Sequence, residues 1–408
     1  MPDLWKKRLV SKPKWRSSSS QIAIILAVSL ATSTLGSSFQ SANGQEAANK
    51  KKVAAATAAP LSSESTRQLD QTTARAIQFL QTKAQSSDGS YSSQVGPGVT
   101  ALITTALLKH GRQPSEPMIA RSLKYLEGFI QPSGGIHQKG TLYRNYETCL
   151  SILCFSEANT NGRYDKTLKR ADAFLKGIQW DEGEGKSKSD LGYGGGGYGK
   201  HKRPDLSNTT FLVEALRATG NDEDSEAIKR ALIFISRCQN LESEHNRSPF
   251  SSKNPDGGFY YTVDAGGSSQ AGETANGGLR SYGSMTYAGL KSMIYAGVDP
   301  DDPRVKAAVQ WVQKHYDLSS NPGLGKAGLY YYYHTFAKAL YAINQPLIED
   351  DDGKKHDWRA ELITELANRQ QSDGSWVNEN DRWLEGDRNL VTGYALLALA
   401  YCRPLAER

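Results

Sequence analysis

A unit of two apolar stretches joined by a glycine-containing turn recurs along this sequence from about residue 65 onward. The first stretch of each unit is amphipathic and ends in an aromatic–leucine pair, often followed by a glutamine. The turn carries an aromatic residue, and the second, more apolar stretch opens near a threonine: Thr100, Thr148, Thr209, Thr286, Thr335 and Thr392. These threonines lie 48 to 77 residues apart. A period of this size with two helices per unit predicts a helical repeat architecture.

Six such hairpins predict an all-α fold, an (α/α)6 toroid with a central cavity. The second stretches, such as Ala395–Ala400, are apolar nearly all round and are expected inside, and the amphipathic first stretches outside. Ring closure lets the first and last units cover each other, whereas an open solenoid needs polar capping units that the sequence lacks. The longest turns precede the second stretches of units three and four, and such insertions gather on one rim.

The N-terminal segment predicts export. Six basic residues precede an apolar run from Ile22 to about Leu35, and small residues follow. The run is short for a bilayer span, so a signal peptide over residues 1–42 is favoured over a membrane anchor. Residues 43–65 lack apolar periodicity and predict a flexible linker, which leaves residues 66–408 for the toroid.

Charge and cysteine usage exclude several classes of function. Cleavage after Ala42 would remove six basic residues and one acidic residue from a chain of net charge +6, so the remainder is nearly neutral. No basic footprint for nucleic acid remains. Four cysteines are too few for a disulfide scaffold, and Cys149 and Cys154 lie in an apolar segment typical of buried thiols. No residue pattern indicates a metal or another cofactor.

The segment from Gln370 to Trp376 resembles the QW motif of squalene and hopene cyclases, and Asp88–Tyr91 and Asp256–Phe259 resemble weaker copies. Together the units, over residues 66–403, resemble the prenyltransferase and squalene-cyclase superfamily. The resemblance implies an α/α toroid with a deep apolar pocket. It implies no particular reaction, because one fold hosts many chemistries.

The catalytic motifs of that superfamily are degenerate here. Its cyclases protonate an alkene with the central acid of an Asp-x-Asp-Asp-Thr motif, and the matching stretch is Asp205-Leu-Ser207-Asn208-Thr209. Serine and asparagine cannot supply that proton. The acidic run from Glu349 to Asp352 is interpreted as a solvated loop. We expect the double change Ser207→Asp and Asn208→Asp to restore some cyclase activity.

The prenyltransferase zinc site is also incomplete. Its histidine lies in a Tyr-x-x-His-Thr stretch, which Tyr330 to Thr335 resembles, but Arg280 and Tyr282 occupy the positions of the other ligands. One ligand does not hold zinc, so His334 is predicted to line the pocket wall.

The ring predicts a ligand site where the inner helices begin. We expect acid or base roles for Glu147, Asp205 and Asp387, although Asp205 also suits a helix N-cap. The glycine-rich stretch 192–199 lacks the context of a phosphate loop and is interpreted as an aromatic-bearing loop at the mouth. The expected ligand-binding residues are mainly aromatic: Tyr143, Tyr146, Tyr193, Tyr198, Asn208, Tyr282, Tyr332, His334, Trp383 and Asn389.

Three functions remain open. The first is an exported protein that binds or transforms an isoprenoid-like small molecule or lipid, with association at a membrane surface; if it is an enzyme, it is a terpene cyclase or prenyltransferase-like one. The second is a polysaccharide lyase or glycosidase, since these enzymes also use α/α toroids and aromatic platforms. The third is a non-catalytic scaffold that uses the rim.

Overall fold

Apolar side chains on nearly all sides explain why six helices lie inside the protein. The computed structural model describes residues 60–199 and 203–403, which belong to one compact unit. Because such helices have no face that suits water, they pack among one another. The inner helices are α2 (Gly98–Lys109), α4 (Arg144–Glu157), α6 (Leu206–Ala218), α8 (Gly283–Tyr295), α10 (Leu329–Ala342) and α12 (Arg388–Cys402).

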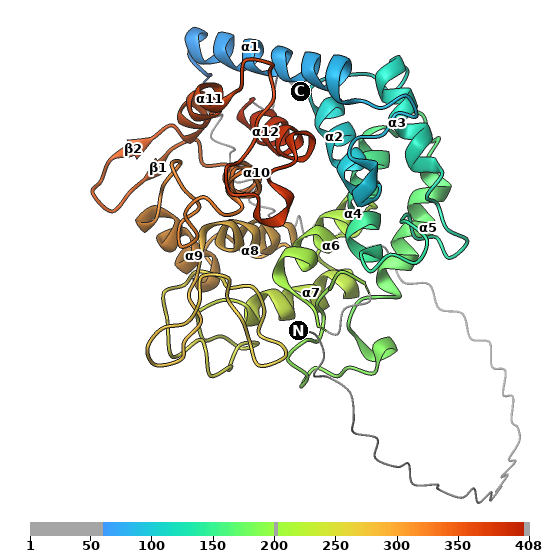
Figure 1. The fold of residues 1–408 in the computed structure, drawn as a ribbon. Coiled ribbons are helices and arrows are strands. Elements are labelled where there is room, and N and C mark those ends of the chain that lie inside the picture. Colours follow the sequence, from blue (N-terminus) through green and yellow to red (C-terminus); the bar gives the residue numbers. More distant parts are fainter. Residues whose placement is uncertain (1–59, 200–202, 404–408) are drawn as a thin grey trace, which may run out of the picture. The chain divides into compact units, whose positions relative to one another are not determined.

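The inner helices form a closed ring. Each packs against two others, in the order α2, α4, α6, α8, α10 and α12, and α12 packs against α2 (Figure 1). The predicted all-α toroid is therefore confirmed. Each inner helix contains one of the six repeat threonines, from Thr100 in α2 to Thr392 in α12.

Amphipathic helices surround this ring. Helix α7 buries Ile228, Phe234 and Ile235 on one face and carries Glu226 and Lys229 on the other. The same pattern places the remaining outer helices, and α1 packs against α11 where the ring closes. These helices are α1 (Ser63–Phe79), α3 (Pro117–Glu127), α5 (Asp165–Lys176), α7 (Glu226–Arg237), α9 (Pro303–Lys314) and α11 (Trp358–Arg369).

The repeat threonines fasten the turns to the inner helices. In five of the six units the threonine Oγ1 accepts a hydrogen bond from a backbone N–H of the preceding turn, at 2.9 to 3.2 Å. The donors are Tyr91, Ile136, Gly196, Phe259 and Trp376. Thr335 instead bonds to carbonyl oxygens of its own helix. A buried turn N–H thus has a partner in most units, which explains why threonine recurs there.

Glutamines fasten the same turns to the next outer helix. The Nε2 of Gln370 donates to Gly374 O in its own turn and to Thr72 O in α1, both at 2.9 Å. Gln85, Gln179 and Gln239 likewise each donate to a glycine carbonyl of their own turn and to a carbonyl of the next outer helix, which is α3, α7 and α9 respectively. The Gln370 bonds join the last unit to the first, so they belong to the closure of the ring.

Short elements complete the fold. Strands β1 (Ile348–Glu349) and β2 (Lys355–His356) pair antiparallel, with Ile348 opposite His356. The acidic run predicted as a solvated loop forms this hairpin, and Asp351 and Asp352 at its tip are exposed. Single-turn helices lie at Leu80–Ala84, Ser93–Val95, Glu182–Glu184 and Arg382–Leu384.

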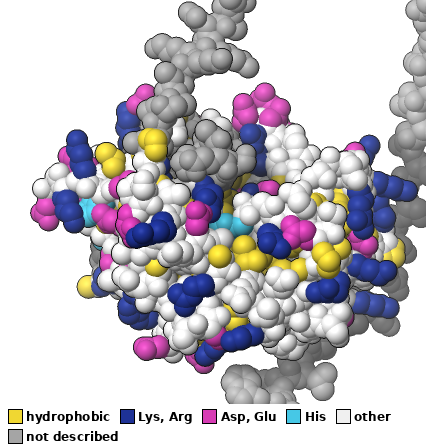
Figure 2. All heavy atoms as spheres, turned by 90° about the horizontal axis from the view of Figure 1, so that it is seen from above, with side chains coloured by type: hydrophobic (Ala, Val, Ile, Leu, Met, Phe, Trp, Pro, Cys, Tyr) yellow, Lys and Arg dark blue, Asp and Glu magenta, His cyan; other side chains and the backbone are white. Residues whose placement is uncertain are grey.

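The surface seen from above the ribbon view carries both signs of charge. Lys and Arg side chains stand beside Asp and Glu over much of this face, with small hydrophobic patches between them (Figure 2). This face therefore lacks the broad single-sign field that attracts a polyanion.

The predicted signal peptide, residues 1–42, lies outside the described residues. Helix α1 begins at Ser63, inside the segment 43–65 predicted as linker, and Ser62 caps it by accepting a bond from Ser65 N. Among the residues that the structure describes, none of the helices is long and apolar enough to cross a membrane.

Candidate functional site

A cavity of about 650 Å³ opens where the inner helices begin. All six contribute side chains from their first turns, and the turns that precede them complete the wall. Such a site is built by convergence, because helices that point the same way in a ring bring their N-terminal ends together at one face. We call it the upper cavity.

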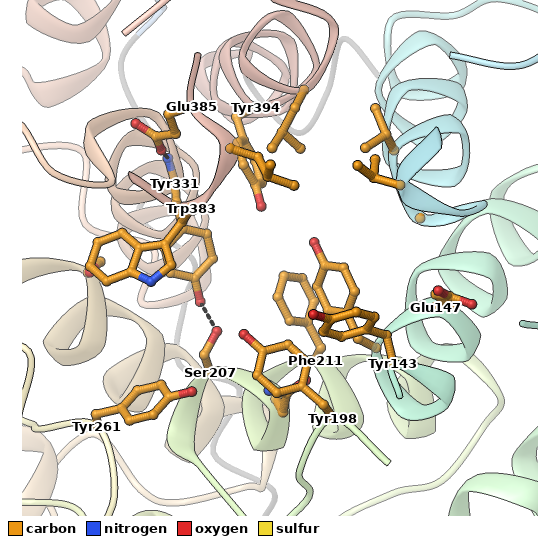
Figure 3. A pocket seen from close by; sticks show the side chains of 18 of the residues that line it. Tyr143, Glu147, Tyr198, Ser207, Phe211, Tyr261, Tyr331, Trp383, Glu385 and Tyr394 are labelled. Atoms are coloured by element: carbon orange, nitrogen blue, oxygen red, sulfur yellow. Dashed lines mark hydrogen bonds between the residues drawn. The ribbon is translucent and has the colours of Figure 1, made fainter. Parts of the chain in front are cut away.

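Aromatic rings dominate its wall. Tyr143 and Tyr198 meet edge to face at 5.2 Å between ring centroids, and Tyr146 and Phe211 at 5.4 Å. Figure 3 shows the labelled rings projecting toward one open space. The lining aromatic residues are Tyr143, Tyr146, Tyr198, Phe211, Tyr261, Tyr282, Tyr331, Trp383 and Tyr394. Rings held edge to face by their neighbours offer a stiff surface to apolar or cationic ligands.

Glu147 is one of two acidic residues that line the upper cavity. Its carboxylate accepts hydrogen bonds from Gln138 N at 2.8 Å and from Thr141 Oγ1 at 3.1 Å. Burial raises the pKa of Glu147 although both bonds favour the charged form. Gly96 leaves room for it, because a Cβ there would lie 2.8 Å from Glu147 Oε1. Of the predicted acids, Glu147 alone lines this cavity.

Glu385 is the second, and it holds the start of α10. Its oxygens accept bonds from Tyr331 N at 2.8 Å, Tyr330 N at 3.2 Å and Asn378 Nδ2 at 2.7 Å. Burial raises the pKa of Glu385 against these bonds. In Figure 3 Glu147 and Glu385 stand on opposite sides of the open space. No Lys, Arg or His is among the described residues of the wall.

The position of the cyclase acid faces the upper cavity but carries Ser207. The Oγ of Ser207 lies 2.9 Å from the hydroxyl of Tyr331, on the dashed line in Figure 3. Asp205 sits behind it as the N-cap of α6 and accepts bonds from Asn208 N and Nδ2. Burial raises the pKa of Asp205 to about 6. Asp205 does not line the cavity, whereas Asn208 does.

Several predicted site residues have structural roles away from the upper cavity. Asp387 caps α12 through Asn389 N and Leu390 N, and Asn389 Nδ2 donates to Ser92 Oγ. The hydroxyl of Tyr193 donates to Glu182, and that of Tyr332 donates to Asp317 O.

The residues aligned with the zinc ligands are not brought together. Tyr282 lines the upper cavity, Arg280 donates to Glu273 O on the surface, and His334 lines a second cavity described below. Within the described part of the chain, no group of three or more His, Cys, Asp or Glu side chains could hold a metal ion.

The sequence analysis did not predict five residues that line the upper cavity: Tyr331, Tyr394, Phe211, Tyr261 and Glu385. A helix turns about 100° per residue, so a residue two positions after a threonine that faces the turn points into the ring. That rule finds Phe211 after Thr209 and Tyr394 after Thr392. No comparable rule finds Glu385, whose position depends on the fold of its loop.

Comparison with known proteins places the fold. No protein-family model matches the sequence, and no curated protein matches it. A variant of the type II terpene cyclase MstE from Scytonema, solved with its substrate geranylgeranyl dihydroxybenzoate, superposes with a TM-score of 0.51 at 13% identity. The match covers 83% of this chain and 98% of that one. A second variant, with the product merosterolic acid A, gives a TM-score of 0.50 at 15% identity over 84% and 99% of the two chains.

A glycosyl hydrolase family 88 protein from Bacteroides vulgatus has the same architecture. Its TM-score is 0.50 at 11% identity, over 82% of this chain and 98% of the other. The chain therefore has the α/α toroid fold of these enzymes, as its resemblance to terpenoid cyclases and prenyltransferases implied. At these identities the likeness concerns the fold alone.

Proposed function

We propose that the upper cavity binds a neutral, largely apolar ligand of the isoprenoid class. The observation that carries this proposal is the wall of nine aromatic residues, among which the described charged groups are two carboxylates and no cation. Aromatic faces attract polyenes and positive charge. A diphosphate or carboxylate would meet negative charge there and is disfavoured.

The proposed role is binding, without cyclisation started by alkene protonation. Ser207 stands where the cyclase acid would be, and its hydroxyl is paired with that of Tyr331. The terpene cyclase neighbours, solved with an isoprenoid substrate and product, support this ligand class.

A carbohydrate substrate is the second candidate. Glu147 and Glu385 are carboxyls of raised pKa in one cavity, and the hydrolase toroid supports this interpretation. Against it, hydrolysis by two carboxyls needs both groups free to exchange protons or attack. Glu385 uses both oxygens to hold α10 and Asn378.

Equilibrium dialysis of the purified protein tests the proposal with three probes: geranylgeraniol, geranylgeranyl diphosphate and a neutral hexasaccharide. We expect the alcohol to bind at least about tenfold more tightly than the diphosphate, which corresponds to about 1.4 kcal/mol. Val95→Trp at the cavity wall should weaken that binding. Leu347→Trp is the matched control, because Leu347 is also exposed and lies outside the cavity. Binding of the hexasaccharide alone would replace the proposal with the carbohydrate interpretation, and equal effects of the two variants would contradict the site.

We further propose that residues 1–42 direct export and are then removed. A basic segment followed by a short apolar run supports this. N-terminal sequencing of protein recovered outside the cytoplasm should begin near residue 43, whereas an intact Met1 in membranes would favour an anchor.

A further inference from the structure

A second cavity, of about 290 Å³, lies toward the opposite end of the ring. Its lining residues come from the later turns of all six inner helices, and Phe211 lines both cavities. We call it the lower cavity. Its chemistry differs from that of the upper cavity, since three cationic side chains line it together with two carboxylates. The cations are Lys109, Arg217 and Lys338, and the carboxylates are Glu157 and Glu214.

A buried carboxylate shared by two lysines stands at its wall. Glu214 Oε1 accepts from Lys291 Nζ, and Oε2 accepts from Lys338 Nζ. The side chains of Glu214 and Lys291 are each 2% exposed, and that of Lys338 is 9% exposed. Burial alone would raise the pKa of Glu214, but the two lysines outweigh it and lower the pKa to about 2. With both lysines protonated, the formal charges of the three groups sum to +1. Burial lowers the pKa of Lys291 although Glu214 favours its charged form, whereas Glu214 holds the pKa of Lys338 above the ordinary value.

A buried net positive charge on this group of side chains needs an anion or hydrogen-bond acceptors to compensate it. A charge removed from water costs several kcal/mol unless an opposite charge or hydrogen bonds compensate it. The ring of Tyr401 offers Lys338 partial compensation, at 5.6 Å from Lys338 Nζ to the ring centroid. An aromatic face compensates much less charge than an anion does.

The other two cations are paired nearer the surface. Lys109 pairs with Glu157, and Arg217 Nη1 lies 3.4 Å from Glu223, whose side chain is 61% exposed. An ion pair that long and that exposed contributes little, so the Arg217 guanidinium keeps donors for another acceptor. Lys109 and Arg217 lie in the last turns of α2 and α6, where carbonyl dipoles attract them. Lys291 and Lys338 lie about one turn deeper.

His334 adds an unpartnered polar group to the same wall. Its side chain is buried, and its Nδ1 has no hydrogen-bond partner among the described residues. Burial, and then the charge of Lys338, lower the pKa of His334 well below the ordinary value, so the ring is neutral and can donate one N–H. His334 therefore adds one hydrogen-bonding group to the wall of the lower cavity, which a bound ligand could use.

We propose that the lower cavity is a binding site for a small phosphate-type oxyanion, held by Lys338 and Arg217. Charge-assisted bonds from lysine and guanidinium groups are the usual means of holding such an anion. The volume admits phosphate together with a small organic group, so free phosphate and a phosphate monoester are both candidates. The proposal does not depend on what the upper cavity binds.

Isothermal titration with inorganic phosphate and with glycerol 3-phosphate, against chloride at constant ionic strength, tests the site. We expect saturable binding of at least one of the two probes. Tighter binding of inorganic phosphate would indicate a site for free phosphate, and tighter binding of glycerol 3-phosphate a site for a phosphate monoester. Arg217→Gln should weaken it about tenfold. Lys229→Gln is the control, because Lys229 is a helical lysine with exposed carboxylate partners, outside the cavity. The absence of saturable heat, or an equal loss in both variants, would overturn the proposal.

A second variant keeps the test independent of folding defects. Glu214→Gln removes the anion shared by Lys291 and Lys338 and leaves the shape unchanged. We expect it to melt at a lower temperature in chloride, and phosphate to raise its Tm by more than that of the unaltered protein. If phosphate raises both melting temperatures equally, the lysines serve only Glu214 and the helix ends, and the proposal fails.

Discussion

At the residue scale, three polar residues at the start of α6 have three different roles. Asp205 caps the helix, Asn208 satisfies the Asp205 carboxylate, and Ser207 faces the upper cavity. A substitution at Ser207 therefore alters the cavity wall, whereas a substitution at Asn208 can remove a hydrogen-bond donor from the buried Asp205 carboxylate. The two positions of the degenerate cyclase motif are not equivalent.

Ser207→Asp alone is consequently the better test of a lost cyclase acid. We expect low but measurable cyclisation of squalene or geranylgeraniol by this variant, detected by gas chromatography and mass spectrometry. Adding Asn208→Asp should lower the free energy of unfolding, since it sets two buried carboxyls side by side. Ser207→Asn is the matched control, with the same shape and no acid. Unchanged substrate with Ser207→Asp would remove support for a decayed cyclase site.

Asp205 predicts a pH dependence of stability. Burial raises its folded pKa to about 6 from an ordinary value of 3.8. A carboxyl whose pKa is higher in the folded state contributes stability that is complete below pH 3.8 and is lost as pH rises through 6, by about 3 kcal/mol. Asp205→Asn keeps the cap and cannot ionise. Urea unfolding should therefore show that the free energy of unfolding of Asp205→Asn rises relative to that of the unaltered protein between pH 4 and pH 7, by up to about 3 kcal/mol. A difference between the two free energies that does not change with pH would contradict the assignment.

At the element scale, the turns between helices depend on glycines that pack against the next outer helix. Gly374 has a φ of +92°, and a Cβ there would lie 2.4 Å from Arg75 O in α1. The same turn bonds to α1 through Gln370, and Arg75 Nη2 donates to Gln371 O at 2.8 Å. The last turn thus closes the ring by direct backbone contact, which a side chain would prevent.

Gly374→Ala should destabilise the protein by about 2 to 4 kcal/mol, from the positive φ together with the clash. Gly111→Ala separates the two effects. Gly111 has a φ of +80°, and apart from Gly111 itself and its chain neighbours no described heavy atom lies within 4 Å of the position that its Cβ would take. That control should cost about 1 to 2 kcal/mol. Denaturant unfolding of both variants measures the difference, and equal losses would show that the contact with α1 adds nothing.

At the scale of the whole molecule, closure of the ring gives one axis with two chemically different ends. Helix starts, aromatic rings and carboxylates surround the upper cavity, and helix ends with lysines surround the lower one. Phe211 stands between them. The apolar ligand and the anion proposed above would therefore contact different side chains, with Phe211 as the residue common to both cavities.

The sequence by itself determined the six units and their inner and outer helices, because each depends on local periodicity and on threonine and glycine positions within one hairpin. It also predicted the closed ring, because the first and last units lack the polar capping faces that an open solenoid needs. It also placed Tyr143, Tyr146, Glu147, Tyr198, Asn208, Tyr282 and Trp383 at the upper cavity, since all lie at or just before the start of an inner helix. For Asp387 and Tyr332 the same rule fails, because a cap faces its own backbone and the rotation of a helix about its axis is set by packing.

Only the tertiary structure decided the rest. Glu385 reaches α10 because Trp383 and Leu384 adopt positive φ angles of 57° and 66°, a strained loop that no propensity predicts. Glu214 and Lys338 are 124 residues apart and meet only because α6 and α10 face each other across the ring. Contacts of that range follow from how the helices pack, and local sequence carries no record of them.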